Sequence, residues 1–132
     1  MTSARDWVLE AASAAADKKA ERIVILDVSK QLVITDYFVI ASGTNDRQVK
    51  TIAEEVGRRL STEHGLKPFR REGEREGQWV LLDYVDFVVH VFLREQREYY
   101  DLERLWSDAP AMTYDETWEA EGARMERAAK AT

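Results

Sequence analysis

The sequence predicts an α/β domain in which helices cover a mixed sheet of five strands. Segments with apolar residues three and four positions apart, typical of helices, alternate with short runs of β-branched and aromatic residues, typical of strands. Within 79–93, two apolar runs flank an acidic turn at 83–86, which indicates a β-hairpin. A predicted helix also separates two strands and forms a crossover, so parallel and antiparallel pairs should share one sheet.

The first predicted helix covers 7–20. Ser3 and Asp6 form the pattern of a capping box, in which a hydroxyl and a carboxylate satisfy the free amides of the first turn. The alanine-rich segment behind them has high helix propensity. The runs IVILDV at 23–28 and YFVIAS at 37–42 then have the β-branched content of buried strands.

A second helix begins after Gly43-Thr44-Asn45 and ends at Gly65. Between these points the apolar residues recur at spacings of three and four: Val49, Ile52, Ala53, Val56 and Leu60. The segment 67–71 is predicted to be an edge strand, because Pro68 cannot donate to a ladder.

The last strand and the last helix complete the domain. The strand at 85–93 is apolar on one face and mostly apolar on the other, as a central strand covered on both sides should be. Tyr99, Leu102, Leu105 and Trp106 then have helical spacing. We predict that 1–109 forms the domain and that 110–132 is an acidic C-terminal tail, partly helical from about Glu116 or mobile.

Composition narrows the class of protein. The chain has 45% hydrophobic residues, no cysteine and a net charge of −6. Proteins that grip nucleic acid by its phosphates normally present a basic face, so a basic protein is a better partner than naked RNA, and little direct RNA contact is expected. No apolar run reaches the length of a membrane span, so a cytoplasmic protein is expected, with no membrane partner.

The residues do not predict an enzyme, a metal site or a cofactor site. His64 and His90 are far apart in the sequence, and no nucleophile, phosphate-loop signature or catalytic triad is evident. Gly43 before a helix could form an anion site, so a nucleotide-binding or nucleotidyltransferase enzyme is an alternative. Asp83 and Asp86 are poorly placed to hold its metal, because a turn separates them.

Binding suits the residues better. Trp79, Leu81 and Asp83 share one face of their strand, opposite Val80 and Leu82, and one of the two faces should be less covered. Tryptophan, tyrosine and arginine dominate interface energetics. The alternatives are core packing for Trp79 and Tyr99 and a structural role for His90.

Seven motifs over most of the chain, about 4–109, resemble the ribosomal silencing factor family, also called RsfS or Iojap. In chain order they are 27–29 (DVS), 35–43 (TDYFVIASG), 72–73 (EG) before Trp79, 83–84 (DY), 88–92 (VVHVF), 97–100 (REYY) and 102–106 (LERLW). Val85 departs from the pattern, because the family often has glycine at this position of the turn.

The resemblance implies a nucleotidyltransferase-like fold without catalytic carboxylates, and binding to the large ribosomal subunit through ribosomal protein L fourteen. There the factor would block subunit joining sterically and repress translation when nutrients fall. It also implies a homodimer, and organelle relatives suggest large-subunit assembly as an alternative function. The residues expected near the partner are Trp79, Asp83, Tyr84, His90, Arg97, Tyr99, Tyr100 and Glu103.

Overall fold

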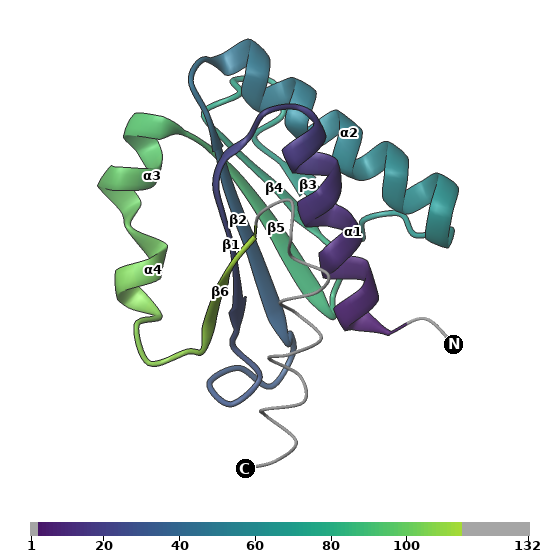
Figure 1. Ribbon diagram of the computed structural model, residues 1–132, viewed down its shortest axis with the longest axis vertical. Helices are drawn as coiled ribbons and strands as arrows, with labels where there is room; N and C mark the ends of the chain where they lie inside the picture. Colours follow the sequence, from purple (N-terminus) through teal and green to yellow (C-terminus); the bar gives the residue numbers. More distant parts are fainter. Residues whose placement is uncertain (1–2, 115–132) are drawn as a thin grey trace.

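A computed structural model describes residues 3–114, which form one mixed sheet between two unequal helical layers (Figure 1). The helices are α1 (Ala4–Asp17), α2 (Asp46–His64), α3 (Arg94–Tyr100) and α4 (Leu102–Leu105). The strands are β1 (Glu21–Asp27), β2 (Tyr37–Gly43), β3 (Arg70–Glu72), β4 (Trp79–Asp83), β5 (Phe87–Leu93) and β6 (Ala111–Thr113). None of the helices within 3–114 is long and apolar enough to cross a membrane.

The strand order is β3-β4-β5-β2-β1-β6, so the sheet is mixed as predicted. Strands β2 and β5 are parallel, with Tyr37 beside Phe87 and Gly43 beside Leu93. The other neighbours are antiparallel. Strand β5 lies between β4 and β2, which explains its apolar residues on both faces.

Helices α1 and α2 cover one face of the sheet and form the larger core (Figure 1). The capping box at Ser3 and Asp6 is present at the start of α1, and Gly65 ends α2 in the left-handed conformation, as predicted. Four alanines of α1 are buried, Ala11, Ala12, Ala14 and Ala15, and their short side chains let this helix approach the sheet and α2 closely. The fully buried Val39, Val80 and Leu82 belong to this core.

Helices α3 and α4 lie on the opposite face and cover only part of it (Figure 1). Leu102 and Trp106 pack against a smaller core that includes Phe38, Ile40 and Phe92. This core is centred on strands β1, β2 and β5. The side chains of β3 and the alternate side chains of β4 on this face remain partly or fully exposed.

The structure differs from the prediction in three places. The described residues form six strands, not five, because β6 pairs with β1 just after Pro110, inside the segment assigned to the tail. The predicted helix starting at Glu116 lies outside the described residues. The last helix is two short helices, because Asp101 adopts φ 48° and ψ 56° and breaks the chain between them. The likeness to nucleotidyltransferases stays a prediction.

Candidate partner-binding face

The exposed part of the sheet lies beside α3, on the face that α1 and α2 do not cover. Trp79, Leu81 and Asp83 are half-buried there, whereas Val80 and Leu82 point into the larger core and are fully buried. The prediction that one face of this strand is less covered is therefore confirmed. We call Trp79, Leu81, Asp83 and Val88, together with Tyr99, Tyr100 and Leu105 from α3 and α4, the open face.

An aromatic group at one end of the open face is centred on Trp79. The indole stacks on Phe92 with ring centroids 4.8 Å apart, and the centroid of the Tyr100 ring lies 4.7 Å from that of the indole. Tyr99 meets Tyr100 edge to face at 5.1 Å. These rings supply a rigid apolar surface with polar tips, which is typical of protein interfaces.

His90 holds the indole of Trp79 in place from below. The Trp79 Nε1–H donates a hydrogen bond to His90 Nδ1 at 3.1 Å, so the neutral imidazole carries its proton on Nε2. Burial lowers the pKa of His90 to about 4, which keeps the ring neutral at physiological pH. The neutral ring is the form that can accept the indole hydrogen bond.

Because His90 is buried in its neutral form, we expect the stability of the protein to depend on pH. Unfolded His90 has a pKa near 6.5, so between about pH 6.5 and 4 the unfolded chain binds the proton that the folded chain excludes. The stabilising contribution is complete above that window and is lost as the pH falls through it. Urea unfolding at pH 7 and pH 5.5 should therefore show a loss of about 1 kcal/mol.

The His90→Gln variant is the control, because glutamine keeps an acceptor for the indole without titrating in this range. Between pH 7 and pH 5.5, the free energy of unfolding of this variant should fall by less than that of the original chain, and the difference is the contribution of His90. Equal losses in both chains would mean that His90 does not titrate between the folded and unfolded states. His64 and the carboxylates are common to both chains, so their contributions cancel in the comparison.

Arg97 fixes the position of α3 and α4 against the sheet. Its side chain is only 2% exposed. Nε and Nη2 donate to the two carboxylate oxygens of Glu103 at 3.0 and 3.2 Å. Nη1 donates to Ser42 Oγ at 3.1 Å and to the Glu21 carbonyl at 3.3 Å. One guanidinium thus joins α3, α4, β1 and β2.

A second arginine attaches α3 to the same end of β1, at the surface. Arg94 donates through Nε and Nη2 to the Glu21 carboxylate at 2.7–3.1 Å. The hydrogen bond to Glu21 raises the pKa of the Arg94 guanidinium. The position of the short helix α3 therefore depends on side-chain contacts with the sheet as well as on its own backbone hydrogen bonds.

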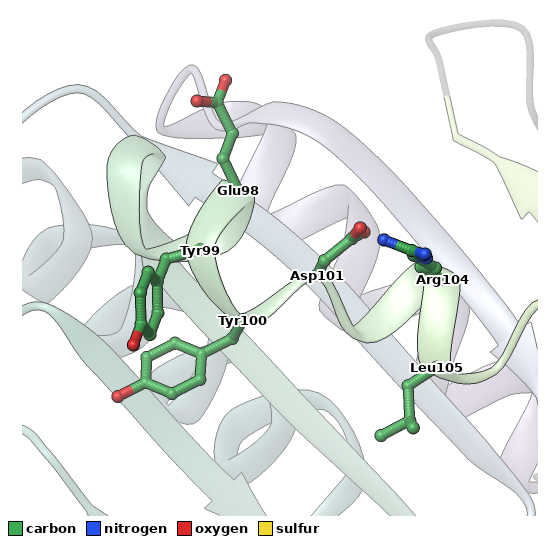
Figure 2. A pocket seen from close by; sticks show the side chains of 6 residues that line it. All are labelled: Glu98, Tyr99, Tyr100, Asp101, Arg104 and Leu105. Carbon is green, nitrogen blue, oxygen red and sulfur yellow. The ribbon is translucent and has the colours of Figure 1, made fainter.

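A pocket of about 540 Å³ opens between α3 and α4 (Figure 2). Its lining residues are Glu98, Tyr99, Tyr100, Asp101, Arg104 and Leu105. Tyr99 is 80% exposed, Tyr100 47% and Leu105 72%. In Figure 2 both tyrosine rings point to the same side of α3, and Leu105 extends from α4. The pocket continues the open face beyond the edge of the sheet.

The eight residues predicted near the partner fall into three groups by position: three lie together at the accessible end of the open face, two lie elsewhere and are partly exposed, and three are buried. Trp79, Tyr99 and Tyr100 lie together at the accessible end of the open face. Asp83 lies at the far end of β4, where its carboxylate accepts a hydrogen bond from Val85 N at 2.8 Å. Glu103 is partly exposed and pairs with Arg97 and Arg22.

The remaining three residues are buried and do not expose their side chains on the open face, and their place near the partner stays a prediction. His90 and Arg97 lie beneath the open face, where they position Trp79 and α3. Tyr84 belongs to the larger core on the opposite face and stacks on Phe87 at 4.7 Å. Burial raises the pKa of Tyr84 to about 12.

Sequence reasoning missed four members of the site. Leu105 was noted only for its helical spacing, and Glu98, Arg104 and Val88 were not assigned to the partner surface. Their positions follow from the break between α3 and α4 and from the uneven cover of the sheet. Residue type alone contains no signal for either feature.

The anion site considered at Gly43 is occupied by the protein's own side chains. Asn45 Oδ1 accepts from Gln48 N at 2.8 Å, and Gln48 Oε1 accepts from Thr44 N at 2.7 Å. Gln48 Nε2 also donates to the carbonyls of Lys18 and Lys19. A search of residues 3–114 finds no group of three or more His, Asp or Glu side chains placed to hold a metal ion.

Comparison with known proteins identifies the family. The family model described as "Ribosomal silencing factor during starvation" (RsfS) matches residues 1–132. A relative from Bacillus subtilis (strain 168), named Ribosomal silencing factor RsfS, is 45% identical over 105 residues, which cover 80% of this chain and 88% of the relative.

Two further similarities extend to a solved structure and to an organelle protein. A crystal structure of a Chromobacterium violaceum protein is 38% identical with a TM-score of 0.77, covering 80% of this chain and 88% of the other. The mouse (Mus musculus) protein named "Mitochondrial assembly of ribosomal large subunit protein 1" is 33% identical over 95 residues, which are 68% of this chain and 40% of that protein. The chain therefore belongs to the RsfS family of ribosomal silencing factors.

Proposed function

We propose that this protein binds the large ribosomal subunit through ribosomal protein L fourteen and sterically blocks joining of the small subunit. By this action in the cytoplasm it would repress translation under nutrient limitation. The observation that carries the proposal is the open face, which belongs to a chain of the silencing factor family. Seven large apolar side chains are exposed within 3–114, and Tyr99, Tyr100 and Leu105 gather in the one pocket between α3 and α4.

Charge supports a basic protein as the partner. The chain has a net charge of −6. Asp83, Glu98 and Asp101 lie on or beside the open face. Complementary charge speeds the encounter with a basic ribosomal protein and disfavours acidic partners. Aromatic anchors at the centre of such a surface would supply most of the affinity.

The proposed mechanism is occupancy. The protein holds a position on the large subunit that the small subunit needs, so inhibition depends on affinity and bulk and not on turnover. The buried pair of Arg97 and Glu103 contributes indirectly, because it fixes the direction in which α3 presents its tyrosines. Two copies could also associate, as the resemblance implies, and sedimentation of the free protein at several concentrations tests that part.

Sedimentation of purified subunits tests the proposal. At physiological salt and magnesium, the protein should migrate with the large subunit and reduce the fraction of joined ribosomes. The Tyr100→Ala variant should weaken binding by roughly 2 kcal/mol, about 30-fold, if Tyr100 anchors the contact as interface aromatics do. Tyr99→Ala should weaken it in the same direction.

Phe69→Ala is the matched control, because Phe69 is also 80% exposed but lies beside β3 and not in the α3–α4 pocket. It should bind the large subunit like the original chain. Failure of the original chain to migrate with the large subunit would contradict the proposal. If Tyr99→Ala, Tyr100→Ala and Phe69→Ala all bind with equal affinity, the contact with the large subunit does not involve the tyrosines of α3.

Assembly of the large subunit is the second candidate function. The mouse relative is named for this process, and a factor bound to the immature subunit could use the same face. If the protein acts in assembly, precursors of the large subunit should accumulate in cells that lack it. Migration with the large subunit without any block of joining would favour this alternative.

A further inference from the structure

Three exposed apolar side chains at one end of the sheet belong neither to the two cores nor to the α3–α4 pocket. Val33 is fully exposed, Ile34 is 79% exposed and Val85 is 51% exposed. Val33 and Ile34 lie in the loop between β1 and β2, which projects beyond the lower end of the sheet in Figure 1. Val85 lies in the turn between β4 and β5. We call these three residues the apolar tip.

A backbone hydrogen bond holds the loop and the turn of the apolar tip together. The Asp36 amide donates to the Asp86 carbonyl at 2.8 Å, beyond the first parallel pair of β2 and β5. Extending this register by one more residue places Thr35 level with Val85, and Ile34 comes next in the loop. The exposed residues of the loop and of the turn are therefore neighbours at the end of the sheet.

The loop is also fixed to the body of the domain. The Val28 amide donates to the Asp36 carbonyl at 2.9 Å, and the Leu32 amide donates to the Val28 carbonyl at 2.9 Å. The Leu32 side chain packs against the smaller core, as does that of Val88 from the open face. The loop therefore lies on the same side of the sheet as the open face.

Val85 has an unfavourable backbone conformation. Its φ of 72° is in the left-handed region, which disfavours β-branched residues. The side chain is not part of either core, so burial does not offset this cost. Backbone strain of this kind is typical of functional sites. An exposed apolar side chain that holds such strain indicates a contact outside the chain.

The apolar tip continues the open face. Asp83 and Val88 are paired across β4 and β5, and they are the open-face residues nearest to Val85. The exposed parts of the two tyrosines and the leucine of the α3–α4 pocket supply less than about half of the ~800 Å² that each protein buries in a standard interface. A partner that buries this area must extend beyond the pocket, and β4 leads from Trp79 to the apolar tip.

Charge favours a basic partner over a second copy of the chain. Asp36 and Asp86 beside the apolar tip are exposed, and neither forms an ion pair within residues 3–114. Lys30 in the same loop opposes only one of these two charges. A second copy would bring the same carboxylates and a net charge of −6 to the contact, whereas a basic protein would bring complementary charge.

We propose that the apolar tip is a second anchor for the protein partner that binds the open face. The inference rests on the proposed function and extends its contact along β4, from the tyrosines of α3 to the loop between β1 and β2. The partner would receive Val33 and Ile34 in an apolar depression with basic side chains at its margin. Burial of these two residues would add affinity, and Asp36 and Asp86 would meet the basic margin.

Titration with large subunits of the same organism, followed by sedimentation, tests the inference. The combined Val33→Ser and Ile34→Ser substitutions remove the exposed apolar groups of the loop. This double variant should bind about tenfold more weakly than the original chain, as expected for an interface anchor. Its urea unfolding midpoint should be unchanged, because both side chains are exposed in the folded chain.

Phe69→Ala is the matched control at the same end of the sheet. Phe69 is 80% exposed, and its amide donates to the Asp83 carbonyl. The next residue, Arg70, places its guanidinium 3.7 Å from the Asp83 carboxylate of the open face. Because side chains alternate along an extended chain, Phe69 lies on the opposite side. Its loss should leave the affinity for the large subunit unchanged.

Val85→Asn separates binding from folding. Asparagine tolerates the left-handed conformation better than valine, so the urea unfolding midpoint should rise. Affinity for the large subunit should instead fall about threefold, because the apolar contact is removed. A residue with only a structural role would not weaken binding while the fold becomes more stable.

The possible outcomes separate the inference from the proposed function. If the Val33→Ser, Ile34→Ser double variant binds like the original chain while Tyr100→Ala weakens binding, the inference fails and the proposed function stands. If the original chain does not bind the large subunit, the proposed function fails and the inference fails with it. Sedimentation of the free chains covers the remaining occupant. If the original chain dimerises and the double variant does not, and both bind the large subunit equally, the apolar tip binds a second copy and the inference is overturned.

Discussion

Replacing Glu103 by alanine is expected to lower the free energy of unfolding by about 3 kcal/mol. The carboxylate accepts two hydrogen bonds from Arg97, whose side chain is 2% exposed. Without Glu103 the guanidinium keeps only neutral acceptors, Ser42 Oγ and the Glu21 carbonyl. A buried charge that loses its opposite charge is more destabilising than the absence of the whole pair. Urea unfolding measures the loss directly.

A double variant distinguishes this cause from simple loss of contacts. Arg97→Met combined with Glu103→Ala removes both charges and retains most of the buried volume. It should be at least about 1 kcal/mol more stable than Glu103→Ala alone. If the losses of unfolding free energy in the two single variants simply add in the double variant, or if the double variant is less stable than Glu103→Ala, the unpaired charge is not the cause.

An exposed ion pair between the same helix and β1 is the control. Arg94 and Glu21 also form a bidentate ion pair, but both side chains are more than one third exposed. Arg94→Gln should therefore change stability by less than about 1 kcal/mol. If Glu103→Ala also reduces binding to the large subunit at a temperature where the variant is folded, the buried pair positions the open face as well as stabilising the fold.

The parts of the fold that the sequence predicts well are those determined by local pattern. The β4–β5 hairpin has two apolar runs and an acidic turn, and α2 has an N-cap residue, an apolar stripe and a terminal glycine. In each case neighbouring residues contain the whole signal. The alternation along β4 also predicts correctly which side chains enter the core, because a strand's faces repeat every second residue.

The rest depends on contacts between distant residues. The spacing of Tyr99, Leu102 and Leu105 fits one continuous helix, but the left-handed Asp101 changes the phase, so Tyr99 and Leu105 become exposed while Leu102 packs against the sheet. Arg97 is charged and would be expected at the surface. It is buried because its partners come from other strands, and residue type cannot predict their proximity.

Strand β6 was missed for a related reason. Its three residues, Ala111–Thr113, have no alternating pattern long enough to predict a strand. They form one because β1 offers a free edge for pairing. The accessible end of the candidate site likewise depends on which part of the sheet α3 and α4 leave uncovered, and that depends on the break at Asp101.

Replacing Gly73 by alanine is expected to destabilise the protein by about 3 kcal/mol or more. Gly73 has φ 81°, a conformation that disfavours any side chain, and a Cβ there would lie 1.9 Å from the Trp79 carbonyl oxygen. The nearest atoms belong to the backbone of β4, so a rotamer change cannot relieve the clash. Either the β3–β4 loop or the start of β4 must move.

Gly65 separates the two contributions, because it has φ 67° and no atom within 4 Å of an added Cβ. Gly65→Ala should therefore lose only the conformational contribution, about 1 kcal/mol, in the same urea titration. A movement of β4 in Gly73→Ala should also disturb the hydrogen bond from Trp79 to His90, so the Trp79 indole N–H signal in NMR spectra should shift. If Gly73→Ala and Gly65→Ala lose the same free energy of unfolding and the indole signal is unchanged, the β3–β4 loop can rearrange at little cost. The close approach at Gly73 would then have no part in placing Trp79 on the open face.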